Sequence, residues 1–329
     1  MSADAASLRQ ALWPLGLLYG AVAAVRNAGY QAGWLRTHRL PVPVVSVGNL
    51  AVGGTGKTPT VAWLCALARA AGRRPGVLAR GYGRAAGAVL NDEGLMLQRQ
   101  LPWLHQEQDP DRVAAAPRLL AKGVDYVVLD DGFQHRRLHR DLDVVCLDAT
   151  LPFGNGLCLP AGDLREFRSG LRRAGLVLLT RAGDLGDAAL VQRIRRLREI
   201  ARQPQLPVHA TVHRPQHLLA QPGEQRRPLD DLRGRRVVLL SAIARPASFR
   251  ATCEALGALV VGEHRHRDHH RFTAAEVQAA SRDAARLDAC LLTTEKDDAR
   301  LGDEPTPRMV LCIGLQFLGP EPLPRELLL

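Results

Sequence analysis

The chain has 329 residues, which is enough for two domains of ordinary size or one enlarged domain. Its 46% hydrophobic and 23% charged residues exclude both a disordered chain and a polytopic membrane protein. The net charge of +11 favours anionic partners such as nucleotides or lipid headgroups, although a coding bias toward arginine explains part of the excess equally well. Only 4% of the residues are aromatic, so we expect no nucleic-acid partner that binds by base stacking.

Residues 1–40 form an amino-terminal apolar segment. The stretch from Gln10 to Val25 carries no charge, but Pro14 and two glycines weaken it, and a bilayer span needs about 20 apolar residues. A secretory signal is one alternative, because residues 21–23 resemble a cleavage site, and a helix that caps the core is another. A helix in the membrane interface with Trp13 and Tyr19 as anchors is a third, and the residues alone do not separate it from the core-capping helix.

Short apolar runs alternate with helical patterns through residues 41–202, which predicts an α/β fold with a doubly wound parallel sheet. These runs cover residues 42–47, 76–79, 126–129, 144–147 and 176–179. A Pro- and Gln-rich stretch, residues 203–228, is the expected linker. Residues 229–329 read as a smaller α/β lobe with strands near 237–240, 259–261, 291–293 and 309–313, and a cleft is expected between the two lobes.

The six cysteines are scattered without any C-x-x-C pair, and most lie in apolar runs. This pattern is typical of buried thiols in a reducing compartment. A disulfide framework or a structural zinc site is therefore not expected from the cysteines.

A glycine-rich loop lies between the first predicted strand and a helical pattern. Backbone amides of such a loop bind phosphate, the lysine reaches the β- and γ-oxygens, and the final threonine binds Mg²⁺. The strict pattern has glycine at position 51, where this chain has Ala51. The predicted ATP-binding residues are Gly53, Gly54, Thr55, Gly56, Lys57 and Thr58.

Carboxylates follow the third apolar run, where strand ends meet the ligand edge of such a sheet. Asp130 and Asp131 are the candidates for the Mg²⁺ site, with an acidic turn as the alternative. Arg80 and Arg84 could offset developing charge, although alone they read as ordinary polar turns. Gln134 could contact ATP or the acceptor, or it could brace Asp131.

Several motifs in this order resemble the tetraacyldisaccharide 4'-kinase family, the lipid A 4'-kinases. They are Val47–Asn49 with Gly53–Pro59, Arg80–Arg84, Asp92–Glu93, Asp130–His135, Gly154–Gly156, Leu159–Gly162, Leu164–Glu166, Asp268–Phe272 and Thr293–Asp297. The match covers nearly the whole chain. It includes the apolar amino terminus, which resembles the family's membrane-associating helix, so the resemblance favours a helix in the membrane interface over one that caps the core. The sequence departs from the usual family pattern at Leu157, Asp163 and Phe167, which puts the local loop geometry in question.

The resemblance implies transfer of the ATP γ-phosphoryl group to the 4'-hydroxyl of a tetraacyl glucosamine disaccharide 1-phosphate, with Mg²⁺, at the cytoplasmic face of the inner membrane. Partners would be this lipid and the membrane surface, with no obligate protein partner.

Roles for individual residues also follow from the resemblance. It implies that Asp92 is the catalytic base, paired with His269, while His270 stays an alternative. Glu93, Asp130 and Asp131 would bind Mg²⁺ or its waters. Arg165 and Glu166 would line the substrate site near the phosphates.

Three other functions compete with a kinase. A partitioning-type P-loop ATPase would have a signature lysine where Val52 stands. A GTPase would need residues 180–184 as its guanine loop, but the aspartate falls one residue late. A lipid-binding scaffold with a vestigial loop is disfavoured by the intact Lys57, Thr58 and Asp130.

Overall fold

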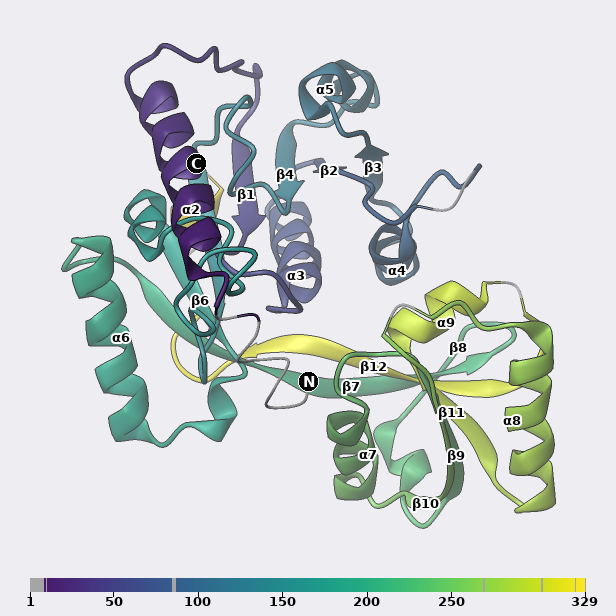
Figure 1. Cartoon of the computed structure of the whole chain (residues 1–329). Coiled ribbons are helices and arrows are strands. Elements are labelled where there is room, and N and C mark those ends of the chain that lie inside the picture. Colours follow the sequence, from purple (N-terminus) through teal and green to yellow (C-terminus); the bar gives the residue numbers. More distant parts are fainter. Residues whose placement is uncertain are drawn as a thin grey trace. The chain divides into compact units, whose positions relative to one another are not determined.

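The computed structural model describes residues 9, 11–84, 87–268, 270–302, 304–322 and 324–328 (Figure 1). The chain divides into two compact units. The first contains Met1–Tyr82, Leu101–His213 and Leu315–Leu329, and the second contains Gly83–Gln100 and Arg214–Gly314.

Helices and strands alternate along most of the chain. The helices are α2 (Trp13–Gln31), α3 (Lys57–Ala70), α4 (Asp92–Gln100), α5 (Arg112–Leu120), α6 (Asp187–Ala201), α7 (Pro246–Ala255), α8 (Ala274–Arg286), α9 (Glu295–Leu301) and α10 (Pro324–Leu327). The strands are β1 (Val44–Gly48), β2 (Pro75–Ala79), β3 (His105–Gln108), β4 (Tyr126–Asp130), β5 (Leu142–Asp148), β6 (Leu176–Thr180), β7 (Val208–Gln221), β8 (Gln225–Arg227), β9 (Arg236–Ser241), β10 (Leu259–Arg265), β11 (Cys290–Thr294) and β12 (Arg308–Phe317).

The first unit is built on a parallel sheet with the strand order β7-β6-β5-β1-β4-β2-β3. The chain leaves β1 toward one side for β4, β2 and β3, and toward the other side for β5, β6 and β7. This reversal at β1 is the doubly wound arrangement that the alternating apolar runs predicted. Every residue of β1, β2, β4 and β6 is buried, as expected when helices cover both faces of a parallel sheet.

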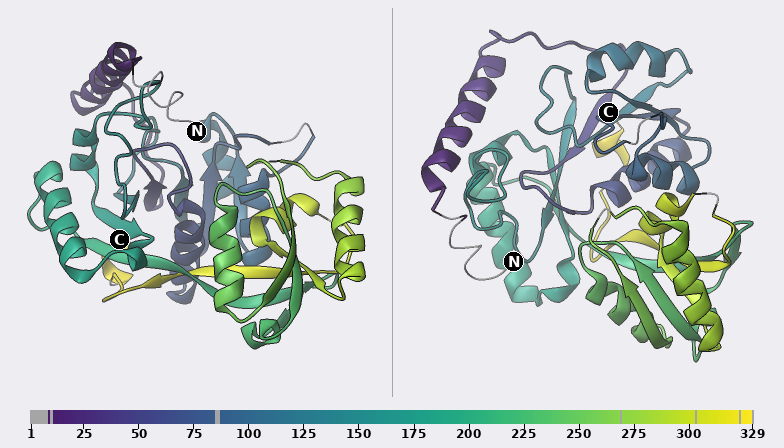
Figure 2. Two further views of the ribbon diagram at one scale, coloured as in Figure 1. Left: turned by 60° about the horizontal axis from the view of Figure 1, so that its bottom comes forward. Right: turned by 45° about the vertical axis from the view of Figure 1, so that its right-hand side comes forward.

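The second unit has its own α/β core. Strand β9 lies between β10 and β11 in parallel pairs, and β12 follows β11. Alternate residues of β9 point to opposite faces: Leu239 packs with Phe249 of α7, and Leu240 packs with Ala280 of α8. Helices α7 and α8 accordingly lie on opposite faces of this sheet, as Figure 1 and Figure 2 both show.

The unit boundaries differ from the ranges expected from the sequence. The stretch expected to be a linker, residues 203–228, contains β7 and β8. The segment that carries α4 belongs to the second unit although the chain on either side of it belongs to the first. Hydrogen bonds from α4 to α9 explain this, since Gln100 Nε2 donates to Glu295 Oε1 at 2.7 Å and Arg99 Nη2 donates to the Gly302 carbonyl at 3.2 Å.

Helix α2 packs on the first unit through residues with small or no side chains. A Cβ on Gly16 would lie 2.7 Å from the Cys158 carbonyl oxygen, and one on Gly20 would lie 2.5 Å from the Phe167 ring. Phe167, one of the departures from the family pattern, therefore forms part of the surface that receives α2. Among the described residues, no helix combines the length and apolar character needed to cross a membrane.

The cysteines are free thiols, as the sequence indicated. All are buried except Cys290, which is half-buried.

Candidate active site

The phosphate loop follows β1 and ends at α3. Gly56 is the N-cap of α3 and has a φ of 80°, while Gly53 has a φ of 112°. L-residues with side chains rarely adopt this region, so both glycines are needed for the turn. The loop thus ends at a helix N-terminus, where free backbone N–H groups and the helix dipole favour phosphate. At position 51, Ala51 makes a β-bridge with Leu164.

Side chains behind the loop hold it in place. Asn49 Nδ2 donates to Thr55 Oγ1 at 2.9 Å, and Thr180 Oγ1 donates to the Thr55 carbonyl at 3.0 Å. Arg181 donates both to the Gly54 carbonyl and to Asp148. A Cβ on Gly56 would lie 2.8 Å from the His213 ring, so the histidine packs directly against the loop. The loop is therefore supported by strands β5, β6 and β7.

Most of these supporting residues lie outside the predicted site, although the sequence carries a signal for some of them. Asp148 and Thr180 end their apolar runs just as Asp130 ends its run, so the same strand-end argument would have found them. Residues 180 and 181 were considered only as part of a guanine loop. In the structure they contact the phosphate loop instead.

Lys57 and the carboxylates meet beside the loop. Lys57 Nζ lies 3.8 Å from Asp131 Oδ1, and Arg165 Nη1 donates to Asp131 Oδ2 at 2.6 Å. Burial raises the pKa of Asp131, but the charges of Lys57 and Arg165 outweigh it and hold that pKa below its usual range. Asp130 is the last residue of β4 and is 6% exposed. Both aspartates thus lie where the sequence predicted, at the carboxyl edge of the sheet.

A further cation lies behind these aspartates. Arg112 of α5 is 4% exposed and donates through Nη1 to the Asp131 carbonyl at 3.1 Å. Burial lowers the pKa of Arg112 below its usual value, although the charges of Asp130 and Asp131 partly oppose this shift. No sequence motif indicated this residue.

Gln134 and Glu166 belong to one hydrogen-bonded network. Gln134 Nε2 donates to Glu166 Oε1 at 3.0 Å and to the Asn49 carbonyl at 2.9 Å. Glu166 is 2% exposed and also accepts from Asn27 of α2 and from both terminal nitrogens of Arg173. This network links the phosphate loop to α2, so the geometry favours a positioning role for both residues over direct substrate contact.

Asp92 begins α4 in the second unit. Its Oδ2 accepts from Arg300 Nε at 2.8 Å. The Arg300 side chain is 1% exposed, and its Nη1 also donates to Asp297 Oδ1 at 2.9 Å and to the Ala242 carbonyl at 2.7 Å. Arg300 therefore orients the candidate base, and no sequence motif indicates this arginine.

Of the two histidines that could pair with Asp92, the structure describes only His270. His269 lies outside the described residues. The alternative, His270, has its Nε2 3.0 Å from Glu276 Oε2.

The other predicted residues lie at element ends. Thr58 and Glu93 are the second residues of α3 and α4, and both are half-buried. Arg80 follows β2 and is exposed, while Arg84 Nη1 donates to the Val89 carbonyl at 3.3 Å.

The residues beside Lys57 fit a divalent cation. Asp131 Oδ1 is buried and has no hydrogen-bond partner in the described part of the chain, since Lys57 Nζ at 3.8 Å lies beyond hydrogen-bond distance. A buried oxygen without a donor requires an explanation, and a hard cation with oxygen ligands such as Mg²⁺ provides one.

A phosphate loop after the central strand, a lysine at the helix start and carboxylates at the neighbouring strand define a P-loop nucleotide-dependent phosphotransferase. Comparison with known proteins identifies the family. The sequence model described as Tetraacyldisaccharide-1-P 4'-kinase matches residues 8–328.

Relatives and a solved structure agree with this match. The tetraacyldisaccharide 4'-kinase of Anaeromyxobacter sp. (strain K) is 46% identical over 89% of this chain and 85% of its own. That of Alkalilimnicola ehrlichii is 40% identical over 96% of this chain and 90% of its own. The crystal structure of "apo" form LpxK from Aquifex aeolicus in complex with ATP aligns with a TM-score of 0.75 and 30% identity, covering 94% of this chain and 95% of that one.

The chain belongs to the tetraacyldisaccharide-1-P 4'-kinase family. It is an ATP- and Mg²⁺-dependent lipid A 4'-kinase, and the comparisons do not favour a partitioning-type ATPase. The prediction from the sequence motifs is confirmed for family, fold and activity. The roles of individual residues stay predictions.

Proposed function

We propose that the loop Gly53–Thr58 binds Mg·ATP and that Asp92 removes the proton from the 4'-hydroxyl of the acylated disaccharide 1-phosphate. The observation that carries this proposal is the phosphate loop at the start of α3 with Lys57 beside Asp131. The lysine ammonium and the loop amides bind the triphosphate oxygens.

Charge around Asp131 is arranged for a polyphosphate. Arg165, Lys57 and Arg112 all contact Asp131 through its side chain or its carbonyl. We propose that Asp130, Asp131, Thr58 and Glu93 hold Mg²⁺ or its waters, and that Mg²⁺ neutralises charge on the phosphates. Arg80 and Arg84 are proposed to offset charge on the transferred group. Gln134 and Glu166 are proposed to position the loop rather than the acceptor.

The transfer step requires one base, which takes up the proton of the acceptor hydroxyl. The acceptor oxygen forms a bond to the γ-phosphorus while the bond from that phosphorus to the bridging oxygen of ADP breaks. The acceptor proton passes to Asp92, whose second oxygen is held by Arg300. His269 is proposed to assist Asp92.

Labelled ATP and a tetraacyl disaccharide 1-phosphate test the assignments. Asp92→Asn is expected to lower transfer at least about 100-fold with ATP affinity unchanged, because the amide cannot accept the proton. Lys57→Met is expected to lower both the transfer rate and the affinity for ATP. Asp231→Asn is the matched control, since Asp231 also pairs with an arginine of the second unit, Arg227 at 2.9 Å. A decrease of only about tenfold for Asp92→Asn equals roughly 1.4 kcal/mol and would rule out a principal base.

We also propose that α2 lies in the surface of the inner membrane, on the cytoplasmic side where ATP is available. Its inner face contains Gly16, Gly20 and Asn27. Its outer face exposes Leu18 by 62%, Val22 by 63% and Val25 by 73%. Trp13, Leu15, Leu17 and Tyr19 are exposed as well. An exposed apolar helix face of this size fits a membrane interface better than water.

Sedimentation with vesicles that contain anionic lipid tests the membrane proposal. Leu18→Glu with Val22→Glu is expected to weaken vesicle binding at least about tenfold, because two charges would enter the apolar layer. Transfer to acceptor dispersed in detergent is expected to remain. The control is Val191→Glu, a similar change at a residue of α6 that is 67% exposed. Unchanged sedimentation of the α2 variant would overturn the membrane proposal while leaving the kinase assignment intact.

A further inference from the structure

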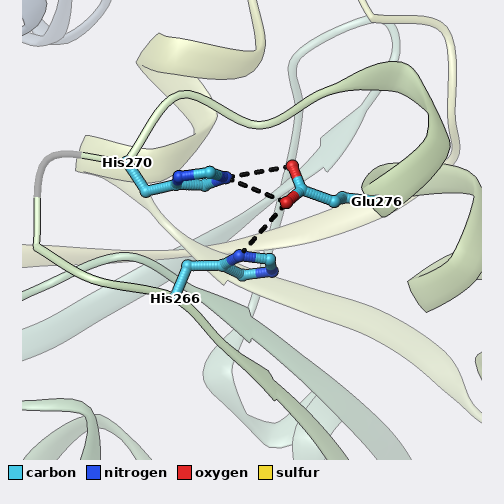
Figure 3. Close-up of side chains that lie close together, drawn as sticks. All are labelled: His266, His270 and Glu276. Atoms are coloured by element: carbon cyan, nitrogen blue, oxygen red, sulfur yellow. Dashed lines mark hydrogen bonds and ion pairs between the residues drawn. The ribbon is translucent and has the colours of Figure 1, made fainter.

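Two histidines and a glutamate of the second unit lie together. His270 is the alternative to His269 as the partner of Asp92, while His266 and Glu276 have no role assigned in the transfer reaction. His266 follows β10, His270 comes four residues later, and Glu276 is in the first turn of α8. All three side chains are half-buried, and their nitrogen and oxygen atoms lie within 4.8 Å of one another. Figure 3 shows both imidazole rings directed at the same carboxylate.

The distances are those of potential metal ligands. His270 Nε2 lies 3.1 Å from Glu276 Oε1, and His266 Nδ1 lies 3.5 Å from the same oxygen. Ligands about 2.1 Å from a tetrahedral zinc ion are about 3.4 Å apart. Two of the three edges of such a site therefore already have nearly the required length.

Neighbouring groups fix the orientation of all three side chains. Glu276 Oε2 accepts from Thr273 N at 2.7 Å and Glu276 N donates to Thr273 Oγ1 at 3.3 Å, which together form the capping box of α8, and Glu276 Oε2 also accepts from Thr273 Oγ1 at 3.0 Å. The two imidazole rings stack with centroids 4.6 Å apart, and Phe272 packs edge-on against both at 5.3 and 5.7 Å. Hydrogen bonds and packing of this kind hold metal ligands in place in known sites.

We propose that His266, His270 and Glu276 form a binding site for a divalent transition-metal ion, with Zn²⁺ as the best match. Two imidazoles and one carboxylate, with a water as fourth ligand, are a ligand set that tetrahedral zinc uses. Mg²⁺ prefers oxygen ligands and octahedral geometry, so this cluster differs in chemistry from the Asp130–Asp131 site.

The bound ion would join the end of β10 to the start of α8. Residues 266–276 would then form a closed loop, tied at both ends and in the middle. The expected consequence is a more stable second unit in the presence of zinc, because the ion binds only the folded arrangement. The alternative is a proton-mediated contact between the histidines and Glu276, with no metal.

Zinc titration of the full chain tests the site. The protein, with any affinity tag removed and metal stripped by chelator, is titrated with Zn²⁺ against a chromogenic chelator in excess Mg²⁺ and without nucleotide. We expect tight binding of one ion, and Co²⁺ in its place should give the visible absorption of a tetrahedral site. His266→Gln and His270→Gln are each expected to weaken zinc binding by at least about 10- to 100-fold, since each removes one ligand.

His264→Gln is the matched control. His264 Nε2 lies 3.0 Å from Asp283 Oδ2, so it is also a histidine paired with a carboxylate in this unit, but the metal-ligand cluster does not include it. Its zinc affinity should equal that of the unchanged chain. Thermal unfolding without zinc shows whether each variant folds.

Two results would overturn the proposal: no zinc or cobalt binding by the unchanged chain, or binding that survives both His266→Gln and His270→Gln. The second result would indicate zinc bound elsewhere. Transfer of labelled phosphate, measured separately in Mg·ATP, reports on the kinase assignments independently of either result.

Discussion

The phosphate loop in the first unit and the Asp92 segment in the second are fixed by different kinds of contact. Hydrogen bonds to neutral groups hold much of the loop, such as those from Asn49 to Thr55 and from Thr180 to the Thr55 carbonyl. Asp92 is held by a buried cation, Arg300, that also neutralises Asp297.

Two aspartate–arginine pairs make the contrast quantitative. The side chains of Arg165 and Asp131 are 25% and 33% exposed, whereas those of Arg300 and Asp297 are 1% and 0% exposed. If Arg165 is removed, water can reach Asp131 and Lys57 remains 3.8 Å away. If Arg300 is removed, the buried Asp297 side chain is not open to water in the same way. The same type of ion pair is therefore partly exposed in one unit and fully buried in the other, so its loss is expected to cost more stability in the second unit.

Arg300→Met is expected to have the largest effect on stability. It leaves Asp297 buried without its cation, which costs about 3–5 kcal/mol in the free energy of unfolding. Burial already raises the pKa of Asp297, so the loss should increase as the pH rises through that pKa. Chemical denaturation of both proteins at several pH values measures this loss of unfolding free energy.

Arg165→Met provides the comparison for Arg300→Met. Because Asp131 is partly exposed and keeps Lys57, this change should cost about 1 kcal/mol or less in unfolding free energy. Equal losses for the two variants would show that burial does not separate the two pairs.

The sequence predicted the elements whose signal is local. Buried parallel strands such as β1, β4 and β6 are continuous apolar runs, and glycine with lysine marks the phosphate loop. Strand β3 was missed because it is the polar edge strand His105–Gln108, and β7 because its half-buried residues mix histidine and glutamine with valine and leucine.

The sequence could not predict contacts between distant residues. Asp92 and Arg300 are 208 positions apart, and no local pattern connects them. The same is true of Gln100 and Glu295, which help to place α4 in the second unit. Glu166 was expected near the phosphates, but its burial among Asn27, Gln134 and Arg173 depends on how α2 and the strands pack.

The contribution of His213 to the free energy of unfolding depends on pH, and its expected size is intermediate among these predictions. Burial, with a smaller contribution from Arg181, lowers the pKa of His213 to about 4. An unfolded histidine has a pKa near 6.5, so the unfolded chain takes up a proton as the pH falls from about 6.5 to 4 while the folded chain does not. The free energy of unfolding should fall over this range by up to about 3 kcal/mol for this residue.

Replacement of His213 by glutamine tests this pH dependence. His213→Gln should flatten the dependence of unfolding free energy on pH between about 4 and 6.5, and leave its slope above pH 7 unchanged. His105→Gln, at an exposed histidine of β3, is the control substitution. Burial also lowers the pKa of His135 to about 4, so part of the dependence should persist in His213→Gln. An unaltered profile would mean that His213 is protonated equally in both states.

Gly56→Ala should have only a modest effect on stability, yet it reaches the loop directly. A non-glycine residue with a φ of 80° costs about 1–2 kcal/mol, and the new methyl group would lie 2.8 Å from the His213 ring. We expect ATP affinity, measured by calorimetry, to fall about tenfold or more, because the amides of the loop must turn away from the phosphates. Gly72→Ala imposes the same backbone cost at a φ of 81°, with no atom within 4 Å of the added Cβ. That control should lower stability alone, so equal ATP affinity in the two variants would show that the loop tolerates the displacement.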